Sequence, residues 1–253
     1  MQQIMGALLA AQWGYLPICM VLLILGTLFQ RRSCWISACF LYIAGCLDSV
    51  LVYFPKIGFF QNLKWNWQGK LIEIVVVMIL MLFPFCTKEL LGLNWPNNPK
   101  IFLSTTVLAL VLITIVVTLS WYLNPDFVSI DLESILYQAT MPGFAEELVF
   151  RGLFLGTLNE ILGKPWRVKG ISFGWGLILV SIIFLFLHIV TYSTKLNHII
   201  WMTDPFDIMT TFLLGLIMGL LREKSDSIWP GIWFHNLMNV GSMTAFAWVA
   251  QLS

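Results

Sequence analysis

The sequence predicts an all-α protein, a polytopic bundle of about eight transmembrane helices. Of its 253 residues, 59% are hydrophobic and only 11% are charged, whereas soluble domains average about 25% charged residues. The hydrophobic residues fall into successive runs of about 17 to 25, the length at which a helix crosses the hydrocarbon core of a bilayer. We therefore expect an integral, multi-pass membrane protein in contact with the lipid bilayer.

Four of these runs lie in the first half of the chain. They extend from about Met5 to Phe29, from about Ser33 to Phe54, from about Leu71 to Cys86, and from Ile101 to Leu123. The first run lacks a preceding basic segment and is too long for a signal peptide, so we expect it to be retained. The second contains an acid, Asp48, and the third carries Glu73 near its start and should end near Pro84. Residues 55–70 combine aromatic side chains with lysines, which is typical of a loop or helix at headgroup level.

The second half of the chain predicts four more helices. They run from about Leu132 to Leu162, from about Ile171 to Val190, from Phe206 to Leu221, and from about Ile228 to Leu252. Pro142 and Gly143 should loosen the first of them just before its acidic residues. Three GxxxG spacings predict close approaches between helices. They are Gly152 with Gly156, Gly170 with Gly174, and Gly215 with Gly219.

We see no internal repeat or soluble domain, and we divide the chain into residues 1–131, with four spans and an acidic linker, and residues 132–253. If the N-terminus lies outside, nine Lys and Arg residues fall in the inner loops and four in the outer ones. Because positive residues favour the cytoplasmic side, both termini are predicted to lie outside. The inner set is Arg31, Arg32, Lys88, Lys100, Lys164, Arg167, Lys169, Arg222 and Lys224, and the outer set is Lys56, Lys64, Lys70 and Lys195.

Composition also excludes several kinds of partner. The net charge is +1 and no basic stripe is present, so we expect no nucleic-acid binding. The five cysteines lie in apolar runs without a CxxC pair, which is typical of small hydrophobic residues rather than of disulfides or metal ligands. We expect no cofactor and no bound metal.

Residues 141–156, MPGFAEELVFRGLFLG, place three charged side chains in an apolar segment. Charges at membrane depth are retained mostly where they pair, face water or take part in chemistry. On a helix, Arg151 lies about 40° from Glu147 and about 140° from Glu146, so Glu147 and Arg151 should form a buried ion pair. Glu146 has no cation on its own helix, so it should exchange protons near neutral pH, as a general base requires.

Further polar residues lie on two of the helices that follow, at His188, His235, Asn236 and Asn239. His235 and Asn239 are four residues apart on one helix face, so both could donate hydrogen bonds to one developing oxyanion. Taken singly, each of these residues also fits a hydrogen bond between packed helices. Together with Glu146, they indicate a site for amide hydrolysis.

Three short patterns in this order resemble a known family. EELVFR at residues 146–151 fits EExxxR, FLFLH at residues 184–188 fits FxxxH, and HNLMN at residues 235–239 fits HxxxN. Over roughly residues 132–245 the chain is similar to the CPBP family of intramembrane proteases, which is named for CAAX proteases and bacteriocin-processing enzymes and is also called Abi. The first four spans, including Asp48, match no motif of that family.

The resemblance implies a metal-independent glutamic endopeptidase whose catalytic core is residues 132–253. Glu146 and His188 would activate a water molecule, and His235 and Asn239 would hold the oxyanion. The ion pair of the EExxxR motif would shape the site. The expected partner is a peptide or protein substrate at the membrane: a prenylated CAAX tail, a leader peptide or a sorting tail.

Three other interpretations use the same polar residues. Glu146, His188 and His235 could form a zinc site with an open position. Asp48, Glu73 and Glu146, with the histidines, could relay protons in a transporter. A non-catalytic immunity or scaffold protein could keep the fold and the motifs without activity.

The predicted helix ends would keep the two histidines apart. They place His188 deep in its helix and His235 only seven residues into the last one. At about 1.5 Å per residue, the two histidines meet only if the boundaries shift or the helices break. Pro142, Pro230 and Gly231 are where we expect the breaks.

Overall fold

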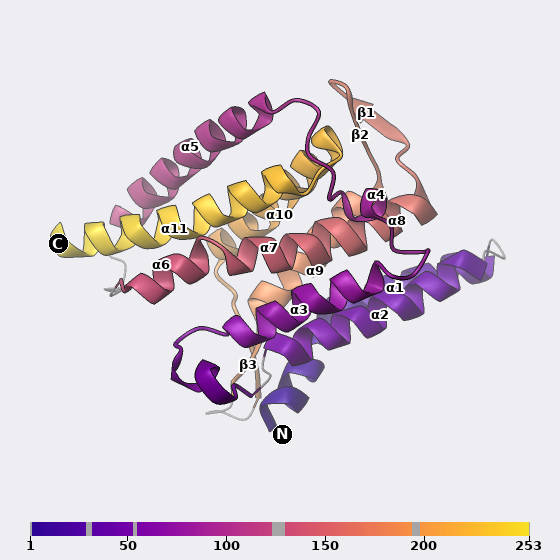
Figure 1. Cartoon of the computed structure of the whole chain (residues 1–253), viewed down its shortest axis with the longest axis horizontal. Helices are drawn as coiled ribbons and strands as arrows, with labels where there is room; N and C mark the ends of the chain where they lie inside the picture. Colours follow the sequence, from indigo (N-terminus) through magenta and orange to yellow (C-terminus); the bar gives the residue numbers. More distant parts are fainter. Residues whose placement is uncertain (1, 29–31, 53–54, 123–129, 194–197, 253) are drawn as a thin grey trace.

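Helices make up most of the computed structural model, which describes residues 2–28, 32–52, 55–122, 130–193 and 198–252. The predicted all-α class is confirmed (Figure 1). The N-terminal elements are α1 (Gln2–Leu28), α2 (Arg32–Val52), the 3-10 turn η1 (Gly58–Asn62), α3 (Trp67–Leu80), α4 (Lys88–Leu91) and α5 (Lys100–Tyr122). Expectations for residues 29–31, 53–54, 123–129 and 194–197, which include part of the acidic linker and the charges of Arg31 and Lys195, lie outside the described residues.

The second half of the chain adds helices and two short hairpins. Its elements are α6 (Leu132–Gln138), α7 (Met141–Glu147), the π-helical η2 (Leu148–Phe154), α8 (Leu155–Leu162), β1 (Trp166–Val168), β2 (Ile171–Phe173), α9 (Trp175–Ile189), β3 (Val190–Ser193), β4 (His198–Trp201), α10 (Pro205–Ser225) and α11 (Trp229–Leu252). In the antiparallel hairpins, Val168 lies opposite Ile171 and Val190 lies opposite Trp201.

The hairpins occupy segments in which the sequence predicted only helices and loops. Strand β2 takes the first residues of the predicted sixth helix, so α9 begins at Trp175 instead of near Ile171. The predicted helix approach at Gly170 and Gly174 is wrong for the same reason. Gly170 lies in the turn of the first hairpin, with a φ of +85° that favours glycine.

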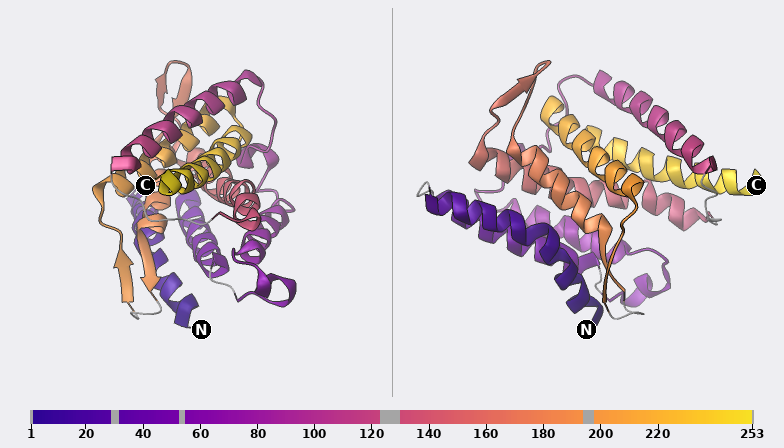
Figure 2. Two further views of the ribbon diagram at one scale, coloured as in Figure 1. Left: turned by 90° about the vertical axis from the view of Figure 1, so that its left-hand side faces the viewer. Right: turned by 180° about the vertical axis from the view of Figure 1, so that it is seen from behind.

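The segment from α6 through α8 lies at the centre of the molecule (Figures 1 and 2). It contacts α3 and α4 from the N-terminal region and α9, α10 and α11 from the C-terminal region. The pair α1 and α2 packs on one flank, and α5 packs on α11 on the other. Side chains on the central segment can therefore meet groups from both regions of the chain.

The central segment follows the predicted course from Leu132 to Leu162 but is interrupted after Gln138. Pro142 has no N–H to donate to the carbonyl of Gln138, and its ring would clash with that carbonyl in a continuous helix. The predicted break near Pro142 is therefore confirmed. The break predicted at Pro230 and Gly231 is wrong, because both residues lie in the first turn of the continuous helix α11, where proline is well tolerated.

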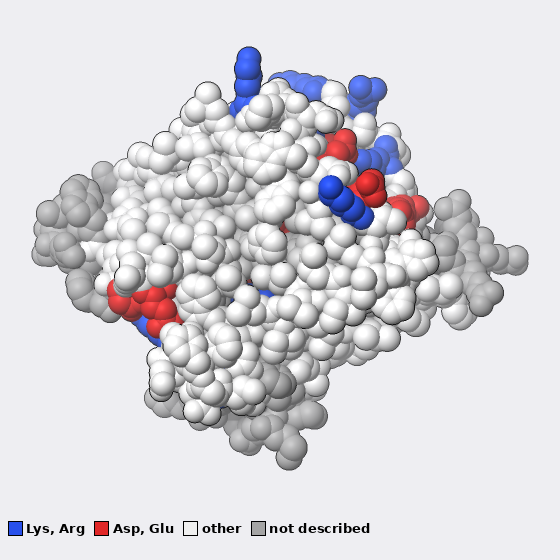
Figure 3. All heavy atoms as spheres, viewed as in Figure 1, with Lys and Arg blue, Asp and Glu red and all other residues white. Residues whose placement is uncertain are grey.

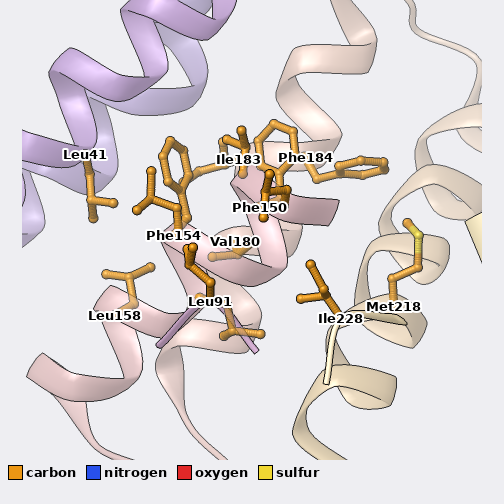
Figure 4. Packing of buried hydrophobic residues seen from close by; sticks show 14 of the residues in the cluster. Leu41, Leu91, Phe150, Phe154, Leu158, Val180, Ile183, Phe184, Met218 and Ile228 are labelled. Carbon is orange, nitrogen blue, oxygen red and sulfur yellow. The ribbon is translucent and has the colours of Figure 1, made fainter. Parts of the chain in front are cut away.

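All seven residues of η2 are buried. The Phe150 ring meets Phe154 at 5.7 Å and Phe184 of α9 at 5.5 Å, both edge to face. Figure 4 shows these rings packed beside Val180 and Ile183. Stretches of π-helix are rare and often occur at functional sites; this one carries Arg151.

Small residues allow α8 and η2 to approach α4. A Cβ on Gly156 would lie 2.4 Å from the carbonyl oxygen of Leu90, and one on Gly152 would lie 3.1 Å from that of Leu91. The glycine pair in α10 faces α9. Two of the three predicted close approaches are therefore confirmed, and one of them joins the N-terminal and C-terminal regions.

Three of the described helices contain stretches long and apolar enough to cross a membrane, by length and composition: Cys34–Leu51, Lys100–Thr118 and Pro205–Ser225. Two shorter apolar helices cover Gln12–Leu28 and Trp175–Ile189. Helix α3 has only 14 residues and ends before the predicted limit at Cys86, so a total of eight spans stays a prediction. On the face shown in Figure 3, most of the charged side chains gather at two ends, and only small parts of charged residues are visible between them.

Candidate active site

Glu146 lies on α7 and faces charged groups from two other helices. Its Oε1 lies 3.3 Å from Nζ of Lys70 on α3, and its Oε2 lies 3.9 Å from Nε2 of His235 on α11. No described residue donates a hydrogen bond to the buried Oε2. Glu146 has no cation partner on its own helix, as expected, but Lys70 of another helix lies beside it, so the expectation that Glu146 exchanges protons near neutral pH is not supported. The ammonium of Lys70 favours the ionised form of the Glu146 carboxylate.

Glu147 forms the predicted ion pair with Arg151. The guanidinium Nη1 lies 3.1 Å from Oε1 of Glu147, and Nη2 donates to the carbonyl of Gly215 on α10 at 3.0 Å. The guanidinium also lies 4.4 Å from the centre of the Phe184 ring, a cation–π contact. Both charged side chains are fully buried. The contacts of Arg151 with Gly215 and Phe184 tie η2 to α10 and α9.

His235 is oriented by the same ion pair. Its Nδ1 lies 3.0 Å from Oε1 of Glu147. The Glu147 carboxylate also accepts from Arg151, so we infer that it accepts from His235 too and that Nδ1 carries a proton. Nε2, which faces Glu146, is then an acceptor in the neutral ring and a donor only in the imidazolium.

His188 lies in the last turn of α9, next to the cavity that Glu146 faces. Its Nδ1 lies 2.7 Å from the carbonyl oxygen of Phe184, which can only accept, so the proton of the neutral ring is on Nδ1 and Nε2 holds a lone pair. Since α9 ends at Ile189 after 15 residues, His188 reaches the N-terminal half of α11, where His235 is the seventh residue. The two histidines line the same cavity without a break in α11, and the helix ends beside them lie within one residue of those predicted.

The four residues expected to carry out the chemistry line a single cavity of about 360 Å³. They are Glu146, His188, His235 and Asn239. A smaller hollow of about 130 Å³ continues past His188, His235 and Asn239 toward α10. A carboxylate, two imidazoles and an amide thus surround a volume large enough for a peptide bond and water.

A larger cavity of about 530 Å³ lies between α5 and α11 and has a different character. It is lined by apolar and aromatic side chains together with Asn236, and none of its lining residues titrates. Oδ1 of Asn236 accepts a hydrogen bond from the backbone N–H of Gly143 at 3.0 Å, so Asn236 joins α11 to α7. We place the chemistry in the smaller cavity, because that is where the ionisable groups meet.

The N-terminal region also supplies charged residues to the cavity, and the sequence did not indicate this position for Lys70. Lys70, which we had assigned to the membrane interface, is buried and lies 3.0 Å from Glu73 and 3.3 Å from Glu146. Asp48 also lines the cavity, and its Oδ2 accepts from the hydroxyl of Tyr15 at 3.1 Å. The i,i+3 spacing of Lys70 and Glu73 at the start of an apolar run was the available signal of a buried pair.

The rim of the cavity is formed where the loop before α3 meets the start of α6. The rings of Trp65 and Tyr137, which both line the cavity, stack at 5.1 Å. Beside them, Asp131 caps α6 by accepting from the backbone N–H of Ser134 and pairs with Lys64 at 3.0 Å. These two bonds, the backbone one first, hold the pKa of Asp131 below its usual value.

The described residues contain no group of three or more His, Cys, Asp and Glu side chains placed to hold a metal ion. Residues 129–241 match the family model described as "Type II CAAX prenyl endopeptidase Rce1-like". No curated protein and no solved structure was found to match the chain.

The family match covers α6 through the first half of α11, which carry all of the EExxxR, FxxxH and HxxxN residues. Members of this family are membrane-embedded peptidases that act on protein or peptide substrates. Residues 129–241 therefore form an Rce1-like domain, of the type II CAAX prenyl endopeptidases in the CPBP family.

Proposed function

We propose that the chain is a glutamic-type intramembrane endopeptidase in which Glu146 and His188 activate the attacking water. The observation that carries this proposal is the shared cavity, into which both side chains project together with His235 and Asn239. Oε2 of Glu146 accepts no hydrogen bond from a described residue, and Nε2 of His188 has a lone pair. A base, a second acceptor and a donor pair are a complete set for amide hydrolysis.

The reaction then needs no group from outside the cavity. Water held by Glu146 Oε2 and His188 Nε2 loses a proton to Glu146 while its oxygen bonds to the scissile carbonyl carbon. The electron pair of the C=O bond moves to its oxygen. When the C–N bond breaks, Glu146 returns the proton to the leaving nitrogen, so an acid and an amine are released and the carboxylate is restored.

We propose that His235 holds the oxyanion as an imidazolium. Its Nδ1–H is engaged by Glu147, so Nε2 can donate only when the ring carries both protons. Carboxylate oxygens lie 3.0 Å from its Nδ1 and 3.9 Å from its Nε2. Asn239 lies one turn further along the same helix face, and its amide supplies the second donor to the charge that develops in the transition state.

We propose further that catalysis requires no metal ion. A zinc ion bound by Glu146 would lie close to the ammonium of Lys70, which is 3.3 Å from Oε1, and the two positive charges would repel each other. The asparagine in the cavity is a poor zinc ligand compared with Cys, His and carboxylates. The residues present suit a hydrogen-bonded water better than a coordinated one.

The proposed substrate is a prenylated CAAX tail, which the description of the family names; leader peptides and sorting tails are the alternatives. We assign the chemistry to residues 132–253 and place four N-terminal spans and a linker in residues 1–131. The proposed multi-pass topology keeps both termini outside, as the distribution of Lys and Arg predicts.

The experiment compares the parent, Glu146→Gln and the control Glu160→Gln, an exposed glutamate on α8. Each is assayed in lipid vesicles with a prenylated CAAX peptide that carries a fluorophore and a quencher, and with a leader peptide labelled in the same way. Glu146→Gln should fold normally and lose about a hundredfold or more of its activity, because it removes the base and keeps the shape. Glu160→Gln should match the parent.

Three results would contradict parts of the proposal. Full turnover by Glu146→Gln would overturn the mechanism, and no cleavage of either peptide by any of the proteins would favour a non-catalytic scaffold. We expect activity to persist after prolonged treatment with phenanthroline. Activity lost on chelation and restored by zinc would make the same residues a metal site.

A further inference from the structure

A buried lysine from the N-terminal region touches the proposed base. Lys70 lies in the first turn of α3, and its side chain is 9% exposed. Its Nζ lies 3.3 Å from Oε1 of Glu146 and 3.0 Å from Oε2 of Glu73. An ammonium among packed membrane helices is costly and is retained mostly where it pairs or takes part in function. Lys70 pairs with one carboxylate from each region of the chain.

We propose that Lys70 is a positioning residue of the peptidase: it keeps Glu146 ionised and fixes which of its oxygens faces the substrate. This inference rests on the proposed function, since it assigns Lys70 a role only if Glu146 is the base. It makes the N-terminal helices part of the active site, although the family match begins at residue 129.

The two oxygens of Glu146 have different surroundings. Oε1 is engaged by Lys70, whereas Oε2 is buried without a hydrogen bond from a described residue and faces Nε2 of His235 at 3.9 Å. A carboxylate with one oxygen held by a fixed cation cannot exchange the roles of its oxygens without losing that contact. Lys70 thereby leaves Oε2 as the oxygen that binds water.

The positive charge of Lys70 is itself balanced by carboxylates. Glu73 pairs with it directly, and Asp48 on α2 contributes a further negative charge nearby. Asp48 is held in turn by the hydroxyl of Tyr15 on α1. Helices α1, α2 and α3 thus form a buried series of contacts that ends at Glu146.

Several other groups act on Glu146, and they define what the test must separate. Its charged and titratable neighbours are Lys70 and Glu73 on α3, Asp48 on α2, Tyr137 on α6, His188 on α9, His235 on α11, and Glu147 and Arg151 on its own segment. Arg151 is already bound to Glu147 and to the carbonyl of Gly215. Removing the Lys70 charge should therefore make Glu146 easier to protonate.

The test uses a double variant that does not change net charge. Lys70→Met alone leaves excess negative charge buried and could prevent folding, so the main variant is Lys70→Met with Glu73→Gln. Lys70→Arg restores the cation. The control is Lys164→Met, which breaks a Lys–Glu contact of 2.9 Å with the buried Glu223. Glu223 keeps a hydrogen bond from Asn159, and neither Lys164 nor Glu223 lines the cavity.

Two measurements are made on each protein as a function of pH. One is the carboxylate infrared band of Glu146, taken as the difference between each protein and the same protein with Glu146→Gln, which needs no substrate. The other is kcat and KM on the prenylated CAAX peptide. Each measurement gives a midpoint: the pH at which half of the band is lost, and the pH at which kcat is half its maximum on the acid limb. In the double variant, both midpoints should rise by about one to three pH units.

This shift implies that, at a pH on the acid limb, kcat of the double variant is at least about tenfold lower than that of the parent, while KM changes little. Lys70→Arg should return both midpoints toward the parent, and Lys164→Met should leave them in place. A double variant whose band and acid limb match those of the parent would overturn the role of Lys70 and leave Glu146 as the base. Equal shifts in Lys164→Met would also overturn it. Full turnover by Glu146→Gln would instead remove the proposed function and, with it, this inference.

Discussion

Residues 132–253 and residues 1–131 contribute charged groups to the same cavity in different ways. The C-terminal region supplies Glu146, whose Oε2 accepts no hydrogen bond from a described residue, beside His188 and His235. In the N-terminal region, Lys70 pairs with Glu73 and Asp48 accepts from Tyr15, while one oxygen each of Glu73 and Asp48 also has no hydrogen bond from a described residue. The first group suits proton transfer, and the second suits the control of charge.

This difference separates two tasks that a buried active site must perform. Chemistry needs atoms that are not already bonded, whereas burial of charge needs every charge to have a partner. Placing the two tasks on different helices lets each group meet its own requirement. The predictions below test whether the two regions divide the tasks in this way.

The largest effect should come from the ion pair behind the catalytic residues. Arg151→Ala leaves Glu147 buried without its cation and should cost about 3 to 5 kcal/mol of stability, with loss of activity. Thermal or denaturant unfolding in detergent measures this cost, and Arg167→Ala, on the exposed strand β1, is the control. An unchanged unfolding midpoint in Arg151→Ala would show that the C-terminal region tolerates an unpaired charge and would break the comparison.

The next effect is on turnover. His235→Ala and Asn239→Ala should each lower kcat about a hundredfold to a thousandfold, equivalent to about 3 to 4 kcal/mol, while KM changes little, because oxyanion donors act in the transition state. His198→Ala, exposed on β4, should leave both constants near those of the parent. If either cavity variant raised KM without lowering kcat, that residue would bind substrate instead.

A smaller effect should appear where the two regions touch. Gly156→Ala brings a Cβ within 2.4 Å of the Leu90 carbonyl oxygen, so α4 and α8 must separate at a cost of about 1 to 3 kcal/mol. Gly215→Ala meets its nearest atoms at 3.5 Å, an ordinary contact, and should be neutral or slightly stabilising. Equal unfolding midpoints for the two variants would show that the regions are not held in close contact there.

The smallest effect concerns the rim and depends on pH. The folded protein lowers the pKa of Asp131, so this carboxylate adds stability above its unfolded pKa of about 3.9, and the contribution is lost as pH falls through the lower folded value. Asp131→Asn should therefore unfold slightly more easily than the parent at pH 7, and the difference should shrink below about pH 4 and vanish once the pH is below the lower folded pKa. Lys64→Met should reproduce part of the loss. A difference that persisted at low pH would exclude the charge as its cause.

Features that depend on a single helix could be predicted from the sequence alone. The Glu147–Arg151 pair follows from i,i+4 spacing, and the interruption of the central segment follows from Pro142. The contact between Lys70 and Glu146 could not be predicted in that way, because it joins residues 76 positions apart through the packing of α3 on α7. The hairpins were missed because aromatic and β-branched residues suit both a strand and a membrane helix.

The position of the cavity rim has a consequence for the compartment that the protease serves. Trp65 and Tyr137 line the cavity beside Lys64 and Asp131, which are exposed and ionic and therefore belong at one aqueous surface of the bilayer. If Glu146 is the base, we expect water to reach it from that surface and cleaved products to leave toward it. The orientation in which the chain inserts would then decide which side of the membrane has its proteins processed.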